Sequence, residues 1–360
     1  METLEMPDEP KNSLQLNCPV PFGPGDKIVM AHGGGGTVMN DLIDRVFRKG
    51  FGTQSVESRH DSAILEAAGR LAFTTDSFVV QPIFFPGGDI GSLSVFGTVN
   101  DLAMAGARPM ALSCAFILEE GLPIQDLERV VSSMRRTADE AGVALVTGDT
   151  KVVDKGKGDG MFVTTAGIGE VLAPHPIGPQ AIRPGDAILV SGDLGRHGVA
   201  ILAVRQGLAF ETEVVSDCAC LWPAVKALLE SGVEVHGLRD LTRGGLAATL
   251  NEFTRDSGFP LSVEESLVPV SGPVRSSCEI LGLDPLYVAN EGRFAIFVPG
   301  DQSDRALKVL RCIPVSSGAV RIGKVETAIP GESPRVTLHT PLGSERYLDL
   351  LSGEQLPRIC

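Results

Sequence analysis

A cluster of prolines limits how this chain can fold. They follow one another closely, at Pro174, Pro176, Pro179 and Pro184. Proline lacks a backbone N–H and clashes with the preceding helical turn, so no long helix or central strand can run through this stretch. We therefore expect a linker over residues 174–184 with a folded domain on each side. A chain of 360 residues is long enough for two domains, each with its own core.

Short β-branched or apolar runs alternate with helical periods on both sides of this linker. Before it, the pattern predicts helices over 93–105 and 124–141 and strands over 143–147 and 161–171. After it, the pattern predicts strands over 187–190 and 294–298 and helices over 199–206, 223–230 and 244–255. The alternation indicates a mixed α/β fold, with an N-terminal domain over 27–173 and a C-terminal domain over 185–340.

The two ends of the chain lack this periodicity. Residues 1–26 are rich in Pro, Asp, Glu and Asn, and we expect a flexible acidic leader there. Residues 341–360 are expected to form a mobile C-terminal tail.

Charge and composition exclude several classes of partner. Lys and Arg number 31 against 45 Asp and Glu, a net charge of −14 that repels nucleic acid and anionic lipid. No apolar run reaches the ~18 residues of a membrane span, and the acidic start is unlike a signal peptide. We expect a cytoplasmic protein with neither nucleic-acid nor membrane partners, whose seven cysteines are free thiols.

A run of glycines follows His32, at Gly33, Gly34, Gly35 and Gly36. It lies between a predicted strand over 28–31 and a predicted helix over 38–48. Glycines accept positive φ angles, so successive N–H groups can turn toward one anion beside a helix N-terminus. The run predicts a phosphate-binding nest, and a flexible turn is the alternative.

Carboxylates recur where strands or loops end, at Asp61, Asp76, Asp101, Asp149 and Asp240. Scattered carboxylates suit Mg²⁺, which bridges one or two of them to substrate phosphates. Helix capping or a solvated turn is the alternative for any single Asp. Asp101 differs because it lies in a small, apolar helical stretch, where a carboxylate needs a compensating partner such as a metal ion.

Three further positions carry chemistry. Lys151 follows Asp149 closely and could act as a base or a phosphate clamp, or could be an exposed charge at a strand end. His197 lies in a glycine-rich turn, where it could hold a loop or contact a ligand. Cys360 is the last residue, and a thiol on a free chain end can enter one active site and reach another; an incidental terminal cysteine is the alternative. Cys218 and Cys220 form a C-x-C pair without a further zinc ligand, and we assign them no role.

Taken together, the motifs resemble the HypE family of hydrogenase maturation proteins, within the aminoimidazole ribonucleotide synthetase superfamily. They are HGGGG at 32–36, TDSF at 75–78, FFPGG at 84–88, GTVNDLA at 97–103, GDTKVV at 148–153, SGDLGRHG at 191–198, RDLTRGG at 239–245, NEG at 290–292 and PRIC at 357–360. The resemblance runs from about residue 28 to the end, and the terminal PRIC is its most specific part.

The resemblance implies a fold and an activity. The fold has two α/β domains, and the N-terminal domain binds ATP and closes a β-barrel with its twin in a homodimer. A partner carbamoyltransferase, as HypF is in that family, places a carbamoyl group on the Cys360 thiol. ATP-dependent dehydration then gives a thiocyanate. The cyanide passes, through an iron-loading complex of the HypC–HypD kind, to the iron of [NiFe] hydrogenase.

The resemblance also assigns roles to residues. It places magnesium on Asp61, Asp76, Asp101 and Asp240. It places ATP against His32, Gly33, Gly34, Gly35, Gly36, Asp76, Asn100, Asp101, Asp149 and Thr150. It gives catalysis to Cys360, Lys151 and Glu291, and the last two are candidates to remove the nitrogen proton.

The residues fit this chemistry independently of the family. Phosphorylation turns the poor leaving oxygen of a primary amide into phosphate, and loss of an N–H proton then completes the nitrile. Two other functions stay open: a small-molecule ATP-dependent synthetase or kinase of the same superfamily, and a non-catalytic thiol-bearing assembly scaffold. Neither the leader nor the C-x-C pair is explained by any of these functions.

Overall fold

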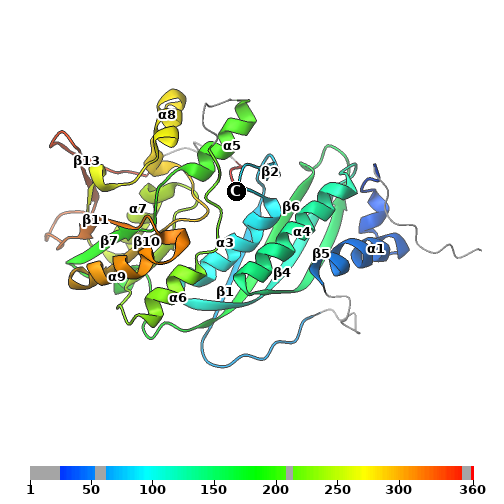
Figure 1. Cartoon of the computed structure of the whole chain (residues 1–360), viewed down its shortest axis with the longest axis horizontal. Coiled ribbons are helices and arrows are strands. Elements are labelled where there is room, and N and C mark those ends of the chain that lie inside the picture. Colours follow the sequence, from blue (N-terminus) through cyan, green and yellow to red (C-terminus); the bar gives the residue numbers. More distant parts are fainter. Residues whose placement is uncertain (1–24, 53–61, 208–213, 351–357) are drawn as a thin grey trace, which may run out of the picture.

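The computed structural model describes residues 25–52, 62–207, 214–350 and 358–360. It has two mixed α/β domains that lie side by side (Figure 1). Nearly all of the predicted leader, up to residue 24, lies outside the described residues, as does Asp61.

The N-terminal domain is built on a four-stranded sheet. Its order is β1 (Leu71–Phe78), β6 (Met161–Val171), β4 (Ala107–Glu119) and β5 (Ala144–Val153), and only the β4–β5 pair is parallel. Helices α3 (Ile90–Met104) and α4 (Ile124–Ala141) cover one face (Figure 1). A short hairpin of β2 (Phe84–Phe85) and β3 (Gly88–Asp89) leads into α3. Asp89 caps that helix, since its Oδ1 accepts from the N–H groups of Gly91 and Ser92 at 2.8 and 3.0 Å.

The other face of this sheet is open in the described chain. Leu71, Phe73 and Ile117 point from it with 50, 71 and 42% of their surface exposed. Large apolar side chains gathered on one sheet face are typical of a surface that another protein covers.

The segment before this sheet differs from its prediction. Residues 28–31 form no strand; η1 (Met30–Gly33) is a short 3-10 helix that packs beside β5. The predicted helix over 38–48 is present as one helical run of α1 (Thr37–Leu42), η2 (Ile43–Arg48) and α2 (Lys49–Phe51). Its buried face, which includes Leu42 and Phe47, joins the core of the N-terminal domain.

The C-terminal domain contains a seven-stranded sheet. The order is β13 (Glu345–Tyr347), β12 (Val336–His339), β9 (Leu261–Glu264), β11 (Val320–Val325), β7 (Asp186–Val190), β10 (Phe294–Pro299) and β8 (Gly237–Asp240). Helix α7 (Gly245–Ser257) packs on one face, and α6 (Trp222–Glu230) and α9 (Ser303–Arg311) on the other. Helices α5 (Arg196–Gln206) and α8 (Gly272–Leu281) pack together beyond the sheet (Figure 1).

The predicted mobile tail does not begin at residue 341, because residues from there to Leu348 are still part of the C-terminal sheet. Strand β13 pairs with β12, and Leu348 N–H donates to Val336 O at 2.9 Å. Leu348 is buried, so its apolar side chain fixes this stretch to the sheet. Residues 351–357 lie outside the described residues.

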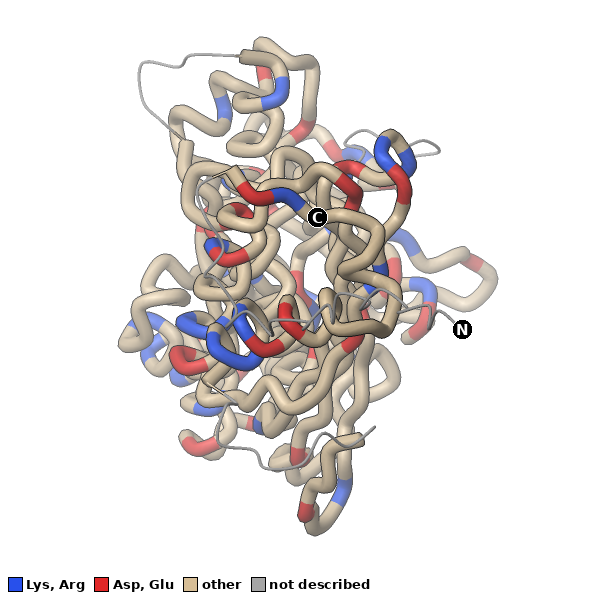
Figure 2. The backbone as a smooth tube through the Cα atoms, turned by 90° about the vertical axis from the view of Figure 1, so that its right-hand side faces the viewer, with Lys and Arg blue, Asp and Glu red and all other residues tan. Residues whose placement is uncertain are grey.

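The two domains share one buried apolar cluster. It includes Phe96 and Val99 of α3 together with Trp222 and Val225 of α6. The C-terminus lies between the domains, close to α3, α5 and β2 (Figure 1). Acidic and basic residues are interspersed on the side seen in Figure 2. Within the described residues, no helix is long and apolar enough to cross a membrane.

Candidate active site

Three predicted aspartates meet between the domains. Asp76 lies on β1, Asp101 on α3, and Asp240 at the end of β8. The Thr74 hydroxyl donates to Asp101 Oδ2 at 2.8 Å, so the helix-facing side of β1 holds that carboxylate in place. The three Asp residues come from three elements and two domains, and the charges of Asp76 and Asp101 act on Asp240. The interdomain site around them is called the cleft below.

Burial and mutual repulsion raise the pKa values of these carboxyls. Burial is the main cause for all three. The charge of Asp101 adds to it for Asp76, and the charges of Asp101 and Asp76 add to it for Asp240, whose pKa rises to about 7. The Arg239 and Arg243 guanidinium groups oppose the shifts without cancelling them. Such a site gains stability from any bound cation.

Glu291 completes the cluster. It is 4% exposed, and burial followed by the charge of Asp240 raises its pKa well above the usual range. Its Oε1 is buried without a hydrogen-bond partner in the described structure. An unpartnered buried carboxylate oxygen is costly, so this atom is suited to contact a bound substrate or cation.

Asp217 holds the backbone around Glu291. Its carboxylate accepts from the N–H groups of Glu291 at 3.4 Å and Gly292 at 3.1 Å. It also accepts from His197 N–H at 3.1 Å, which ties the start of α5 to the same loop. Sequence reasoning missed Asp217, and its only signal was its position directly before Cys218.

Asn100, a predicted nucleotide contact, is hydrogen-bonded to the backbone of the C-terminal domain. Its Nδ2 donates to Ala219 O at 3.0 Å and to Glu291 O at 3.4 Å, and its Oδ1 accepts from Leu221 N–H at 2.8 Å. The amide is therefore used in joining α3 to the C-terminal domain. Asn100 is 2% exposed, which supports a structural task.

Residues 358–360, called here the terminal tripeptide, lie in this cleft. Val79 N–H donates to Cys360 O at 3.2 Å, and Gln81 N–H to Arg358 O at 3.4 Å. Ile359 is 1% exposed. The end of the chain thus pairs with the stretch that follows β1.

The Cys360 thiol is part of the carboxylate cluster. Burial raises its pKa far above the usual range, and the negative charges of Glu291, Asp76 and Asp240 add to the effect. Arg243 opposes it. A thiol in these surroundings stays protonated, and any group attached to its sulfur lies near the carboxyls of Glu291, Asp76 and Asp240.

Lys151 and Asp149 do not join this cluster within one chain. They lie on edge strand β5, whereas Asp76 lies on edge strand β1, and β6 and β4 separate the two strands by roughly 14 Å at the usual strand spacing. The register pairs Asp149 with Ala115, Ala115 with Thr164, and Thr164 with Ser77, so Asp149 shares the face of Ser77.

The two groups of residues therefore lie on opposite faces of the sheet. Neighbours along a strand point to opposite sides, so Asp76 faces α3 while Asp149 and Lys151 point from the open face. Lys151 Nζ pairs with Asp149 Oδ2 at 2.5 Å, and both side chains are more than half exposed. The predicted meeting of Lys151 and Glu291 across the interdomain cleft does not occur within one protomer.

The glycine run lies at the same distant edge. Among Gly33, Gly34, Gly35 and Gly36, only Gly35 has a positive φ, of 75°. A Cβ at Gly33 would lie 2.8 Å from Val152 N, so this glycine permits close packing against β5. His32 is buried and accepts from Val29 N–H at 3.0 Å, and Thr150 is buried as well. Within one chain, Gly34 N–H donates to Ala31 O at 3.3 Å and Gly35 N–H to Met39 Sδ at 3.2 Å.

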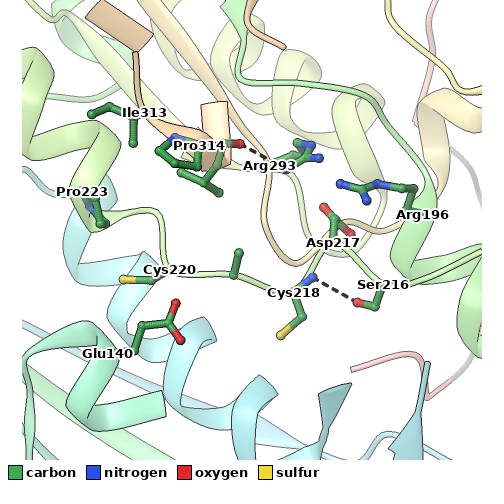
Figure 3. Close-up of a pocket in the computed structure, with 12 residues that line it drawn as sticks. Glu140, Arg196, Ser216, Asp217, Cys218, Cys220, Pro223, Arg293, Ile313 and Pro314 are labelled. Carbon is green, nitrogen blue, oxygen red and sulfur yellow. Dashed lines mark hydrogen bonds between the residues drawn. The ribbon is translucent and has the colours of Figure 1, made fainter. Parts of the chain in front are cut away.

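A second hollow of about 500 Å³ lies on the other side of residues 216–220 (Figure 3). Arg196, Arg293 and Asp217 lie toward one end, Cys220 and Glu140 lie at the other, and Cys218 lies between them (Figure 3). Burial raises the pKa of Cys220 to about 11 and that of Cys218 well above its usual range. Neither thiol is primed as a nucleophile.

Comparison with known proteins identifies two family domains in this chain. Residues 59–171 match the model for the N-terminal domain of AIR synthase related proteins, and residues 183–329 match the model for the C-terminal domain. The carbamoyl dehydratase HypE of Azotobacter vinelandii is 51% identical over 336 residues, which cover 92% of this chain and 97% of that protein.

Two solved structures are also similar. A HypE structure in complex with ATP is 50% identical, with a TM-score of 0.88, over 92% of this chain and 99% of that one. A HypE–HypF complex contains a chain 42% identical, with a TM-score of 0.75, over 86% of this chain and 99% of that one. With its domains, its interdomain carboxylates and its terminal cysteine, this chain belongs to the carbamoyl dehydratase HypE family of hydrogenase maturation proteins.

Proposed function

We propose that this chain dehydrates an S-carbamoyl group carried on its own Cys360 to a thiocyanate, with ATP as the co-substrate. The product supplies the cyanide ligand of the iron in [NiFe] hydrogenase. The observation that carries the proposal is the position of Cys360, beside the interdomain carboxylates. A sulfur-bound substrate there needs no separate binding site, because the chain itself delivers it.

ATP activates the amide oxygen. The terminal phosphoryl group is transferred to the carbamoyl oxygen, which converts that oxygen into a phosphate leaving group. One N–H proton leaves as the oxygen is phosphorylated. Loss of the second N–H proton and departure of phosphate then leave S–C≡N, ADP and inorganic phosphate. The similarity to a HypE structure in complex with ATP supports nucleotide binding.

Asp76, Asp101 and Asp240 would hold magnesium, as would Asp61, which lies outside the described residues. Their raised pKa values and the unpartnered Oε1 of Glu291 fit a site that takes a cation. Among the described residues, no three metal-ligating side chains approach closely enough to chelate an ion by themselves. Mg²⁺ usually takes one or two protein carboxylates and completes its shell with phosphate and water oxygens, so members of this set would hold it together with the phosphates of ATP.

Glu291 would take the nitrogen proton. Its raised pKa brings it toward the range in which a carboxylate is an effective base near neutral pH. The Asp217 contacts fix its backbone, and Oε1 is free for the substrate. A cation on the neighbouring aspartates would lower the pKa of Glu291 and keep it ionised before the proton is removed.

Lys151 would act through a homodimer. Lys151 points from the open face of the N-terminal sheet, which also carries Leu71, Phe73 and Ile117. A second copy of the chain would cover this face if the two sheets close a barrel. His32, the glycine run, Asp149 and Thr150 belong to the same edge and would contact the nucleotide of the second protomer. The opposite-face geometry supports this arrangement, since Lys151 cannot reach Glu291 within one chain.

We propose two protein partners in addition. A HypF-like carbamoyltransferase would load Cys360, as the HypE–HypF complex of a relative suggests, and a HypC–HypD-like complex would accept the cyanide. These encounters would take place in the cytoplasm, where ATP is available.

Intact-protein mass spectrometry tests the proposal. Incubation with the carbamoyltransferase system should add one carbamoyl group at Cys360, and addition of ATP and Mg²⁺ should then remove the mass of one water. A mass gain elsewhere, or no ATP-dependent loss, would refute the dehydratase function. ATP turnover without a carbamoyl group would favour the synthetase or kinase instead.

A further inference from the structure

The terminal tripeptide is held in the cleft by contacts of two kinds. Its backbone pairs with Val79 and Gln81, and these bonds depend on no side chain. Side chains outside the tripeptide add further contacts: Arg205 donates to Arg358 O, Asp159 pairs with Arg358, and His197 pairs with Ile359 O. Only these contacts can be altered by substitution without changing the tripeptide itself.

The His197 contact is more deeply buried than the ion pair of Arg358. His197 Nε2 lies 2.8 Å from Ile359 O, and the two residues are 0 and 1% exposed. The side chains of Arg358 and Asp159 are 39 and 40% exposed, so their ion pair is weakened by water and salt. A hydrogen bond in a dry site is stronger, and a buried carbonyl that loses its donor is costly. The contact also lies one residue from the reacting thiol.

The surroundings of His197 fix its orientation and tautomer. A carbonyl oxygen only accepts, so Nε2 carries the proton and Nδ1 accepts from the Ser216 hydroxyl at 2.8 Å. Ser216 Oγ accepts in turn from Cys218 N–H at 3.1 Å (Figure 3). Phe85 packs against the imidazole in an edge-to-face arrangement, with ring centroids 5.4 Å apart. Burial lowers the pKa of His197, which agrees with a neutral ring.

Helix α5 connects this histidine to the base. Gly195, directly before α5, has a φ of 87°, and its N–H donates to Asn290 Oδ1 at 2.7 Å. Asn290 precedes Glu291, and Asp217 binds the N–H groups of both His197 and Glu291. The anchor of the tripeptide and the proposed base are therefore parts of one hydrogen-bonded unit.

We infer that His197 is a positioning residue for the dehydration: its Nε2–H bond to the Ile359 carbonyl sets how much of the time Cys360 lies in the cleft. The inference rests on the proposed function for its catalytic meaning. Its structural content, which is how often the tripeptide leaves the cleft, is independent of ATP and of any carbamoyl group.

Alkylation of Cys360 measures that equilibrium in the full chain. In the cleft the Cys360 thiol is half-buried and protonated, so it reacts with iodoacetamide mainly after the tripeptide leaves, and its rate follows the fraction that has left. Peptide mass spectrometry gives the rate at each cysteine. Exposed Cys312 reports on the reagent, and buried Cys278 reports on folding.

Three variants separate the donor from the packing. His197→Leu replaces the imidazole with an apolar side chain that has no hydrogen-bond donor. We expect Cys360 to be alkylated roughly 3- to 10-fold faster, with the rates at Cys312 and Cys278 unchanged. His197→Gln can place an N–H near the Nε2 position, and we expect the rate to return to within about 3-fold of the wild type. His339→Leu removes a histidine that contacts Ser262 and Glu345, and it should leave Cys360 unchanged.

Unchanged Cys360 alkylation in His197→Leu with Cys278 protected would overturn the inference, as would equal acceleration in His197→Leu and His197→Gln. If His197→Leu also exposes Cys278, nitrogen NMR of the wild-type histidines decides. Deletion of residues 358–360 should shift Nε2 of one buried histidine, and an unchanged histidine spectrum would refute the contact.

The two half-reactions give a second signature, which a general loss of structure would not produce. His197→Leu should slow dehydration of a loaded Cys360 by about the factor seen in alkylation, while loading by the carbamoyltransferase stays equal or becomes faster. Loss of both half-reactions would contradict the positioning role. If the wild type does not dehydrate the group, the proposed function fails and the alkylation result still stands.

Discussion

The Cys360 thiol is half-buried beside the Glu291 carboxylate, and burial together with that negative charge raises the pKa of the thiol. A protonated thiol is a poor nucleophile, so Cys360 is not ready to accept a carbamoyl group while it lies in the cleft. Once loaded, the same position brings the carbamoyl nitrogen toward the proposed base. The cleft therefore suits the second half of the reaction and disfavours the first.

Removal of the thiol should end turnover and leave the fold intact. Cys360→Ala loses one side chain at the chain end, so we expect thermal unfolding and ATP binding close to those of the wild type. No mass gain or loss should be seen in the carbamoylation and dehydration assay. Cys312→Ala, which removes an exposed thiol, is the matched control and should behave as the wild type. Normal dehydration by Cys360→Ala would refute the carrier role.

Loss of the proposed base should slow the chemical step. Glu291→Gln keeps the size of the side chain but cannot accept the proton, so single-turnover dehydration should fall by roughly 10² to 10⁴. ATP should still bind. Glu140→Gln, at the far side of Cys218, tests the same change at an exposed site and should keep the wild-type rate. Wild-type dehydration in Glu291→Gln would remove Glu291 from the mechanism.

Lys151 should act on the active site of the second protomer. Lys151→Ala and Glu291→Gln should each be nearly inactive alone, and a mixture of the two chains should recover activity. Random pairing makes half of the dimers mixed, and each mixed dimer has one intact site, so about a quarter of the sites should work. Mixing after denaturation and refolding, followed by mass spectrometry, measures this. No recovery, although mixed dimers form, would place both residues in one chain or in none.

Much of the fold was predictable where periodicity is strong. The amphipathic pattern of 124–141 and the β-branched run of 161–171 have the bounds of α4 and β6. Strand β1 was not predicted, because Thr74, Thr75, Asp76 and Ser77 give it a polar sequence. Thr74 and Asp76 lie on the side of β1 that faces α3. There Thr74 donates a hydrogen bond to Asp101 and Asp76 is repelled by it, so neither contributes an apolar side chain to a core.

The candidate site was predictable as a set of residues but not as a geometry. Asp76, Asp101, Asp240, Glu291 and Cys360 converge as the motifs indicated. The placement of Lys151 was not predictable, because a shift of one residue in the β4–β5 register would move it to the other face. A bulge between Leu112 and Ser113 sets that register, and nothing local in the sequence indicates it.

Asp101 should contribute to ATP binding by holding Mg²⁺. Asp101→Asn removes one negative charge from the cluster, so we expect the Mg²⁺-dependent gain in ATP affinity to fall by about 10- to 100-fold. Asp304→Asn removes an exposed carboxylate of α9 and serves as the control. ATP titration by calorimetry, with and without Mg²⁺, measures the difference. Equal affinity and equal turnover in Asp101→Asn would return this residue to a purely structural role.

Asp240 should destabilise the protein that lacks nucleotide and metal. Its pKa rises from the usual 3.8 to about 7 in the fold, so between these values the folded chain holds a proton that the unfolded chain releases. The free energy of unfolding therefore falls as the pH rises from about 4 to about 7 and then levels off. Asp240→Asn removes this loss, and we expect it to be more stable than the wild type at pH 8 by roughly 1 to 4 kcal/mol.

Urea unfolding in chelator, at pH 4, 6 and 8, measures this gain. The advantage of Asp240→Asn should be near zero at pH 4 and grow with pH, because at pH 4 the folded wild type already carries the proton. Asp304→Asn should show no such trend, since its carboxylate is exposed on α9. The same Asp240→Asn variant should gain less stability than the wild type when Mg²⁺ and ATP are added, because the repulsion that it removes is what a bound cation relieves. A stability difference that does not vary with pH would show that Asp240 is ionised or paired throughout, and the charge-repulsion account of the cleft would then be wrong.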